Sequence, residues 1–286
     1  MRPVLIEIPL PGGLRIPLHA FGVMIVLGFL LACHVGDREA RRRGLPDFMY
    51  DLGLVMLLTG IAGGRLFYYF QFYDERFAGE SFLEIFKIWK GGLVFYGGAI
   101  VGFLGGLVYC LRRKLPVAEC LDIAAIATPL AMAIGRLGCF LNGCCFGKVC
   151  AADYPLGVVF PLESNARASQ LARGLVGPES PALPIHPVQL YQAGHDFLMF
   201  ALLLAFLRMP GTPRGAGMPL LFVLYGIGRF VLEGFRGDHD LTGTGLTLSQ
   251  NLSVALFVAF GCLLLILLVK VPFGVKGPGR ILEKTS

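Results

Sequence analysis

Seven long apolar stretches, separated by short bands of charged residues, constrain this chain more than any other feature of its sequence. A bilayer core about 30 Å thick is crossed by roughly 20 apolar residues in an α-helix. The stretches that reach this length are 18–36, 50–70, 92–111, 121–141, 188–207, 216–235 and 248–269. Asp196 interrupts the fifth stretch and Glu233 the sixth. The pattern predicts an all-α, polytopic membrane protein with about seven transmembrane helices.

The composition agrees with a membrane protein and excludes other classes. Charged residues make up 15% of the chain, against roughly a quarter in soluble domains, and the mean hydropathy is +0.69. This excludes a soluble enzyme, a disordered chain and, despite the formal net charge of +6, a nucleic-acid-binding protein. No internal repeat suggests a duplicated transporter half. We therefore predict one integral-membrane domain, 1–286, in which 144–187 forms an extracytoplasmic loop or lid.

Lysine and arginine set the predicted orientation, because short loops rich in these residues stay in the cytoplasm. The connections after the first, third and fifth spans, together with the C-terminal tail, hold 13 of the 25 basic residues. The connections on the other side hold nine, spread over a longer stretch of chain. We therefore expect the N-terminus outside and the C-terminus in the cytoplasm, which requires an odd number of spans.

Ionisable side chains inside the spans are the first sign of function, because each costs about +2.5 to +3.5 kcal/mol on the insertion scale. The residues of this kind are His19, Asp51, Arg65, Asp122, Arg136, Asp196, Arg229 and Glu233. They could pair with one another, as Arg229 and Glu233 would at an i,i+4 spacing. Three arginines instead favour a phospholipid-headgroup site, because the planar guanidinium fork matches a phosphate.

The stretch 135–147 is the densest in unusual residues. Its four glycines allow close helix packing or an abrupt helix end. Helix packing and a C-cap would explain these glycines as well as a functional site would. Asn142 adds an amide at the outer edge of the fourth span, able to bond a glycerol or phosphate oxygen.

This stretch reads G-R-L-G-C-F-L-N-G-C-C-F-G and resembles the signature of the prolipoprotein diacylglyceryl transferase family, G-R-x-G-N-F-x-N-x-E-x-x-G. Other blocks resemble the family in the same order: His19 with Gly22, Gly63-Gly64-Arg65, 91–98, 186–191 and 225–236. The resemblance extends from about residue 15 to 270. It implies the family's seven-span fold with an outward N-terminus.

Four positions depart from the family pattern. Cys139 and Cys144 stand where the signature has Asn and Glu, and Phe21 stands where many members have Tyr. Tyr96 replaces a histidine that has been proposed as catalytic in some members. Because the arginines and Asn142 are intact, we interpret the chain as a divergent branch rather than a paralogue with altered chemistry.

The resemblance implies transfer of a diacylglyceryl group from phosphatidylglycerol to the lipobox cysteine of a preprolipoprotein, in the bacterial cytoplasmic (inner) membrane. The implied partners are phosphatidylglycerol, preprolipoprotein signal peptides and membrane lipids, and no cofactor is implied. Two alternatives remain open. One is a phospholipid transporter without covalent chemistry, and the other is a non-catalytic paralogue that binds lipoprotein signal peptides.

The resemblance also implies roles for single residues. Arg136 and Arg229 would bind the headgroup phosphate and stabilise it as it leaves, while a positive cavity would favour the acceptor thiolate. Asn142 and Tyr225 would be hydrogen-bonding groups, and Glu233 would orient Arg229. The implied substrate-binding set is completed by His19 and Arg65.

The sequence offers three candidates for the proton acceptor. Tyr96 is the positional candidate, although a phenol with a reference pKa near 10 is a weak base. His19 and His186 are alternatives. Arginines that make the thiolate abundant would make a dedicated base unnecessary.

The eight cysteines include a C-x4-C-C-x4-C cluster formed by Cys139, Cys144, Cys145 and Cys150. These residues could be packed free thiols, or could close a disulfide in an oxidising compartment. A metal site or a cysteine nucleophile is a further alternative, but the spacing differs from that of zinc ribbons and fingers. The connectivity cannot be read from the sequence, and we assign no metal here.

Overall fold

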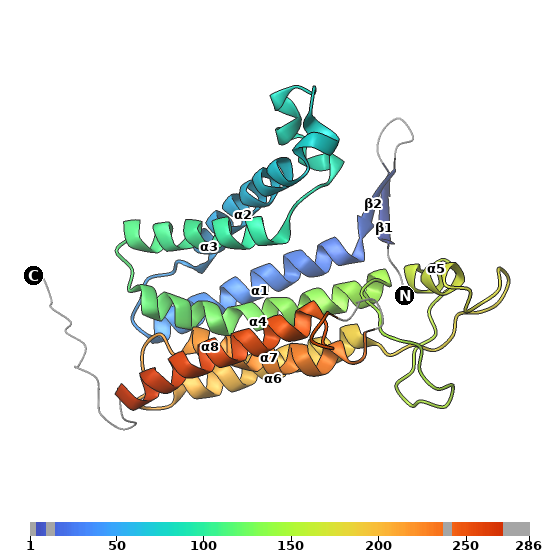
Figure 1. Ribbon diagram of the computed structural model, residues 1–286. Coiled ribbons are helices and arrows are strands. Elements are labelled where there is room, and N and C mark those ends of the chain that lie inside the picture. The colour runs from blue at the N-terminus through green and yellow to red at the C-terminus, as the bar shows by residue number, and fades with distance from the viewer. Residues whose placement is uncertain (1–3, 10–14, 237–241, 271–286) are drawn as a thin grey trace, which may run out of the picture. The chain divides into compact units, whose positions relative to one another are not determined.

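The structure is a computed structural model that describes residues 4–9, 15–236 and 242–270 (Figure 1). Its regular elements are β1 (Val4–Pro9), β2 (Arg15–His19), α1 (Ala20–Arg42), α2 (Met49–Gln71), η1 (Tyr73–Phe77), η2 (Phe82–Phe86), η3 (Ile88–Lys90), α3 (Phe95–Arg112), α4 (Val117–Asn142), α5 (Asn165–Ala172), α6 (Val188–Arg208), α7 (Gly217–Glu233) and α8 (Leu248–Lys270). Four basic residues used for the predicted orientation lie outside the described residues: Arg2, Lys276, Arg280 and Lys284.

Each of the seven predicted spans contains a long helix. Within the described residues, six helices are long and apolar enough to cross a membrane: α1, α2, α3, α4, α6 and α8. The remaining predicted span contains α7, which is 17 residues long. Helices dominate because in a lipid core every backbone amide and carbonyl must be paired within the chain. The prediction of a polytopic helical membrane protein is confirmed.

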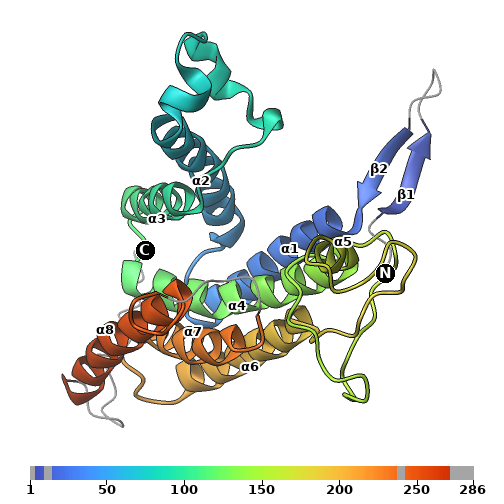
Figure 2. The ribbon, with the colours of Figure 1, turned by 45° about the vertical axis from the view of Figure 1, so that its right-hand side comes forward.

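The chain folds as two compact units. The first unit comprises Met1–Ala32 and Ala124–Ser286, and the second comprises Cys33–Ile123. In the first unit α4, α6 and α7 run alongside one another (Figures 1 and 2). The second unit is built on the α2–α3 pair. The grouping of both units into one functional domain stays a prediction.

Small residues allow the helices of the first unit to approach closely, as is common in membrane proteins. A Cβ atom added at Gly28 of α1 would lie 3.1 Å from the Ala131 carbonyl oxygen of α4. One added at Gly226 of α7 would lie 2.9 Å from the Ser253 carbonyl oxygen of α8. These contacts fix the helices that carry the site described below.

Glycines also allow close helix contacts in the second unit. A Cβ atom at Gly98 of α3 would lie 3.0 Å from the Gly60 carbonyl oxygen of α2. At the N-terminal end of α2, the buried carboxylate of Asp37 accepts hydrogen bonds from the backbone N–H groups of Phe48 and Met49, at 2.9 and 2.8 Å. This satisfies donors that a helix N-terminus leaves without an intrahelical partner.

Two segments differ from the sequence prediction. The first predicted span, 18–36, begins inside a strand, because β1 and β2 form an antiparallel hairpin that ends at His19. The helix itself starts at Ala20 and continues to Arg42, beyond the predicted end. Between α2 and α3, 73–90 forms one π-helical and two 3-10 turns. Such short elements depend on tertiary contacts and leave no long periodic pattern in the sequence.

Candidate functional site

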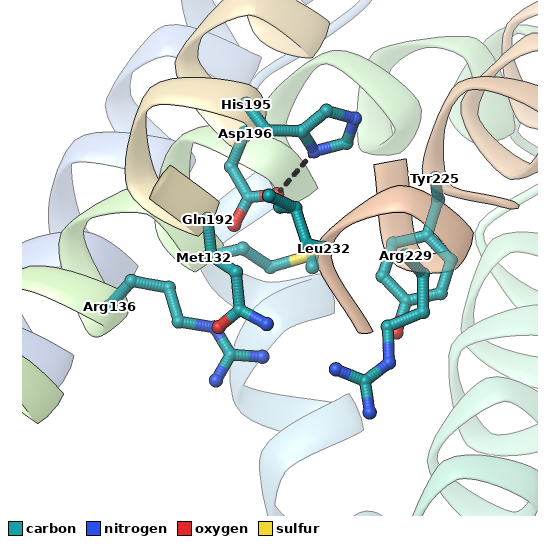
Figure 3. Close-up of a pocket in the computed structure, with 8 residues that line it drawn as sticks. All are labelled: Met132, Arg136, Gln192, His195, Asp196, Tyr225, Arg229 and Leu232. Carbon is teal, nitrogen blue, oxygen red and sulfur yellow. Dashed lines mark hydrogen bonds and ion pairs between the residues drawn. The ribbon is translucent and has the colours of Figure 1, made fainter. Parts of the chain in front are cut away.

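A small pocket in the first unit is lined by polar side chains from three helices (Figure 3). Met132 and Arg136 come from α4, and Tyr225, Arg229 and Leu232 from α7. The side chains contributed by α6 are Gln192, His195 and Asp196. In the view of Figure 3 the Arg136 guanidinium overlaps the Gln192 amide and the Arg229 guanidinium lies to the right of both, with His195 and Asp196 above them. The structure therefore brings together two of the arginines that the sequence singled out.

Arg229 is held in place by two neighbours. Its Nη2 atom lies 3.0 Å from Oε2 of Glu233 and donates to Oγ of Ser249 at 3.0 Å. The Glu233 side chain is buried, and its Oε1 accepts a hydrogen bond from Thr247 Oγ1 at 3.1 Å. The i,i+4 pair expected from the sequence is present, and it orients Arg229 while part of the guanidinium faces the pocket.

Thr247 also directly precedes α8 and caps it. Its hydroxyl accepts from the Gln250 backbone N–H at 3.2 Å, and Gln250 Oε1 accepts from the Thr247 N–H at 3.0 Å. This reciprocal arrangement is a capping box, which stabilises a helix N-terminus. One hydroxyl therefore links the start of α8 to the carboxylate that holds Arg229.

Arg136 lies in the penultimate turn of α4, and its side chain is partly exposed. Among the described residues, none forms a hydrogen bond or ion pair with its guanidinium group. A permanently charged group at the wall of a pocket, without a carboxylate partner there, favours an anionic ligand. This separates Arg136 from Arg229, whose charge is already compensated by Glu233.

Two buried acceptors at the pocket also lack partners. Within the described part of the chain, Oε1 of Gln192 and Oδ2 of Asp196 accept no hydrogen bond. Both residues are at least 95% buried. A buried polar atom without a partner costs about 1–3 kcal/mol. A ligand with hydroxyl donors would relieve that cost.

His195 and Gln192 were not among the residues predicted from the sequence. The Nδ1 atom of His195 lies 3.3 Å from Oδ1 of Asp196. The other edge of the ring packs against Gly228 of α7, where a Cβ atom would come within 1.9 Å of Nε2. A histidine–aspartate pair inside an otherwise apolar stretch was the sequence signal that could have identified this position.

The other predicted residues of the first unit lie in several places. Tyr225 lines the pocket. Asn142 is the last residue of α4, partly exposed, and does not line it. His19 is exposed at the end of β2. His186 packs against Tyr154 and Phe235, with ring centroids 4.7 and 5.2 Å apart, so it orders the loop it belongs to.

The remaining two predicted residues belong to the second unit. Tyr96 is the second residue of α3 and is 61% exposed. Arg65 is buried and donates to five backbone carbonyl oxygens: those of Glu84, Ile85, Lys87, Gly91 and Gly92. Its guanidinium thus fixes the segment between η2 and α3. The substrate-binding role of Arg65 and the proton-accepting role of Tyr96 stay predictions.

Three thiols converge at the C-terminal end of α4. The Sγ atoms of Cys139, Cys144 and Cys145 all lie within 4.8 Å of one another, and all three cysteines are free. The pKa of the Cys145 thiol is lowered to about 5, first by a hydrogen bond from Cys139 and further by the positive charges of Arg136 and Arg236. Cys150 stands apart from this cluster, and burial raises the pKa of its thiol.

The segment 144–187, the predicted loop or lid, is held together by contacts of its own. Phe160, Ala166 and Ile185 form a buried apolar cluster. Gln170 of α5 accepts from the Leu183 N–H at 2.8 Å and donates to the Leu183 carbonyl at 3.0 Å. Arg167 donates to the backbone carbonyls of Gly177, Pro178 and Ser180. The segment is therefore an ordered cap, and its action as a lid stays a prediction.

Comparison with known proteins gives one consistent family. The family model described as "Prolipoprotein diacylglyceryl transferase" matches residues 3–267. A protein of Clostridium tetani named phosphatidylglycerol–prolipoprotein diacylglyceryl transferase is 33% identical over 255 residues, which are 89% of this chain and 93% of that protein. Proteins of the same name from Paraburkholderia phymatum and Geobacter sulfurreducens are each 31% identical, over 84% and 83% of this chain and 85% and 86% of their own.

Proposed function

Because the chain belongs to the prolipoprotein diacylglyceryl transferase family, we propose that it transfers a diacylglyceryl group from phosphatidylglycerol to the acceptor cysteine of a prolipoprotein. The observation that carries this proposal is the pocket between α4, α6 and α7. It combines one arginine held by Glu233 with a second arginine that has no carboxylate partner, and two buried acceptors that have no donor, among the residues that the structure describes.

The chemistry fits these groups. The acceptor thiolate sulfur forms a bond to the terminal carbon of the diacylglyceryl group while the bond from that carbon to the phosphate oxygen breaks. The electron pair of the broken bond leaves with glycerol phosphate, on which negative charge grows. Arg136 and Arg229 would stabilise that charge, and preorganised donors of this kind contribute most to a rate when charge develops.

The glycerol headgroup would match the remaining pocket groups. It carries two hydroxyl donors, and Gln192 Oε1 and Asp196 Oδ2 are two buried acceptors. The Tyr225 hydroxyl adds a third polar group to the same pocket. A choline headgroup has no hydroxyl to offer and would leave both acceptors unpaired.

The location and orientation are part of the proposal. The chain is embedded in a membrane, and we place it in the bacterial inner membrane with its N-terminus outside and its C-terminus in the cytoplasm. The basic residues of the short connections support this orientation. It puts the end of α4 and the cap 144–187 on the outer side, where exported lipoproteins present their lipobox.

The test is mass spectrometry of a lipobox peptide incubated with the purified protein in phosphatidylglycerol-containing vesicles. We expect a peptide that gains one diacylglyceryl unit on cysteine, with release of glycerol phosphate. Arg136→Ala and Arg229→Ala should reduce the rate by about 10²–10³-fold, the usual cost of losing a donor to a developing anion. Arg173→Ala, on the surface of the cap, serves as the control of equal charge change.

Two results would contradict the proposal. If the peptide stays unmodified while the protein moves phosphatidylglycerol between leaflets, the result would support a transporter. An unmodified peptide that nevertheless binds the protein tightly would support the non-catalytic paralogue. Full activity in either arginine variant would remove that arginine from the site.

A further inference from the structure

The three thiols at the end of α4 are brought together by the way the helix stops. The Gly143 N–H bonds to the Phe140 carbonyl at 3.2 Å, and the Cys144 N–H bonds to the Cys139 carbonyl at 3.1 Å. This is a Schellman motif, with Gly143 in the left-handed conformation at φ +70°. The motif folds Cys144 back over Cys139, which lies in the last turn of the helix.

Cys145 is then held in an unusual backbone conformation. Its φ is +58°, in the left-handed region that residues other than glycine seldom adopt. The carbonyl of the preceding Cys144 accepts a hydrogen bond from the buried Gln189 side chain of α6, at 2.7 Å. This contact anchors the turn, which directs the third thiol toward the other two.

We propose that Cys139, Cys144 and Cys145 bind one zinc ion and that the fourth coordination position receives the acceptor cysteine of the prolipoprotein. The zinc site itself is argued from these residues alone. The identity of the fourth ligand rests on the proposed function, since it requires a thiol substrate.

The distances fit a three-thiolate site. Thiolates bound to tetrahedral zinc at about 2.3 Å lie roughly 3.8 Å apart. The three Sγ atoms already lie within 4.8 Å of one another. Small side-chain rotations that move each Sγ atom by less than about 1 Å would bring all three to the zinc-binding distance. Thiolate ligands select zinc or Cu(I) over magnesium, calcium or manganese. We favour zinc because tetrahedral zinc is commonly held by three protein ligands with a fourth position left for water or substrate.

The number of ligands favours a site with an open position. In the described part of the chain, the group contains three cysteines and no fourth histidine, cysteine or carboxylate. Structural zinc sites are usually closed by four protein ligands, whereas catalytic sites keep three and leave one position for water or substrate. A fourth thiol from the substrate would complete this site in the same way.

The charges around the cluster are consistent with that ligand. Zinc with three thiolates carries a net charge of −1, and a fourth thiolate brings it to −2. Arg136 and Arg236 both act electrostatically on Cys145, and their two positive charges would balance the loaded site. Arg136 also lines the proposed headgroup pocket, so one residue adjoins both the thiol and the phosphate.

Zinc would add to the arginines a second means of forming the acceptor thiolate. On coordination, the cysteine thiol loses its proton to solvent and its sulfur keeps a lone pair. That lone pair forms the S–C bond as the C–O bond to phosphate breaks, and the electron pair leaves with glycerol phosphate. The product is a neutral thioether, a weaker ligand that dissociates, and zinc remains Zn²⁺ throughout.

The test measures metal before it measures activity. The protein is purified in detergent without chelators, and its zinc content is determined by elemental analysis. We expect one zinc per chain in the unchanged protein, and its loss in the variant carrying Cys139→Ser, Cys144→Ser and Cys145→Ser together. Cys150→Ser and Cys262→Ser, which lie outside the cluster, are the matched controls and should keep the metal.

Cobalt substitution then tests the fourth position. Co²⁺ in a three-thiolate site gives charge-transfer absorption, and we expect a lipobox peptide to increase it by about one third as a fourth thiolate binds. The same peptide with serine in place of cysteine should leave the spectrum unchanged. An unchanged spectrum with the cysteine peptide would overturn the assignment of the fourth ligand.

Other outcomes overturn the zinc site or separate it from the proposed function. No zinc above the level of the triple variant, a disulfide among the three cysteines, or Cu(I) in place of zinc would each contradict the site. Metal-free protein that transfers diacylglyceryl at the full rate would contradict the zinc proposal and leave the proposed function standing. Protein with one zinc and no transfer would contradict the proposed function and leave the metal site standing.

Discussion

The Oε2 atom of Glu233 lies 3.0 Å from Nη2 of Arg229, one helical turn earlier on α7, and the same carboxylate is tied to α8 through Thr247. The glutamate side chain is buried and the arginine side chain is 16% exposed. Burying an ion pair costs desolvation free energy, so this pair is weak evidence for a contribution to the stability of the fold. Its evident consequence is that the guanidinium is fixed at the pocket wall. The first prediction therefore concerns position rather than stability.

Thr247→Val should lower kcat/KM by about tenfold, which corresponds to roughly 1.4 kcal/mol. The valine removes the hydroxyl that donates to Glu233, so the carboxylate holds Arg229 less firmly. Thr247→Ser keeps the hydroxyl and should remain close to the unchanged protein. The measurement is the rate of peptide modification, together with thermal unfolding in detergent.

Gln250→Ala separates the two roles of Thr247. It removes the other half of the capping box at the start of α8 and leaves the Thr247–Glu233 contact in place. It should lower stability by an amount typical of a lost cap, about 0.5–2 kcal/mol, with little change in kcat/KM. Equal losses of activity in Thr247→Val and Gln250→Ala would show that only the cap matters.

Gly228→Ala should destabilise the protein even though alanine is the better helix former. In an open helix this change stabilises by about 1 kcal/mol, but here the new Cβ would meet His195 Nε2 at 1.9 Å. Gly194→Ala on α6 is the matched control, because nothing lies within 4 Å of its added Cβ. We expect Gly194→Ala to be neutral or stabilising in thermal unfolding.

A double variant tests whether the histidine is the cause. His195→Ala removes the ring, so Gly228→Ala combined with His195→Ala should be more stable than Gly228→Ala alone. Residues in direct contact commonly show coupling of about 0.5–3 kcal/mol in such a cycle. Strict additivity of the two substitutions would mean that the ring does not occupy this space.

Gln192→Leu should weaken the preference for glycerol headgroups. The leucine keeps the volume and removes the buried acceptor that has no partner among the described residues. Protein stability should hold or rise, because the buried Gln192 Oε1 accepts no hydrogen bond within the described residues. We expect kcat/KM with phosphatidylglycerol to fall about tenfold, since one good hydrogen bond contributes roughly 1 kcal/mol or more. An unchanged rate would remove Gln192 from headgroup recognition.

The sequence predicted the features that depend on local pattern. Apolar runs of membrane-crossing length identified the helices because a lipid core leaves the backbone few other structures. The spacing of Arg229 and Glu233 indicated their pairing, because residues four apart share one face of a helix. Arg136 and Tyr225 were expected at the site and line the same pocket as Arg229.

What the sequence could not predict depends on tertiary packing. Gln192 and His195 reach the pocket only because α6 packs against α7, with Gly228 making room for the ring. The carbonyl partners of Arg65 lie 19–27 residues further along the chain. The cysteine spacing differed from known zinc motifs, and the convergence of three thiols follows from the Schellman turn at Gly143.

Arg65→Ala should destabilise the second unit rather than abolish headgroup binding. Its guanidinium donates to five backbone carbonyls, from Glu84 to Gly92, and hydrogen bonds to charged groups contribute about 1.5–3 kcal/mol each. Losing them frees the segment between η2 and α3, so limited proteolysis should cut within 82–92 at least tenfold faster. Arg65→Lys, with one point charge, should restore only part of the protection.

Arg76→Ala is the control for this prediction, because Arg76 and Arg65 line one pocket of the second unit, but Arg76 is exposed and lies over the Tyr68 ring face at 5.9 Å. It should leave proteolysis unchanged. If Arg65→Ala instead leaves the cleavage rate and the thermal unfolding of the protein unaltered and raises the KM for phosphatidylglycerol, the residue belongs to the substrate site, as the family resemblance implied. Measuring KM and cleavage on the same preparation distinguishes the two roles directly.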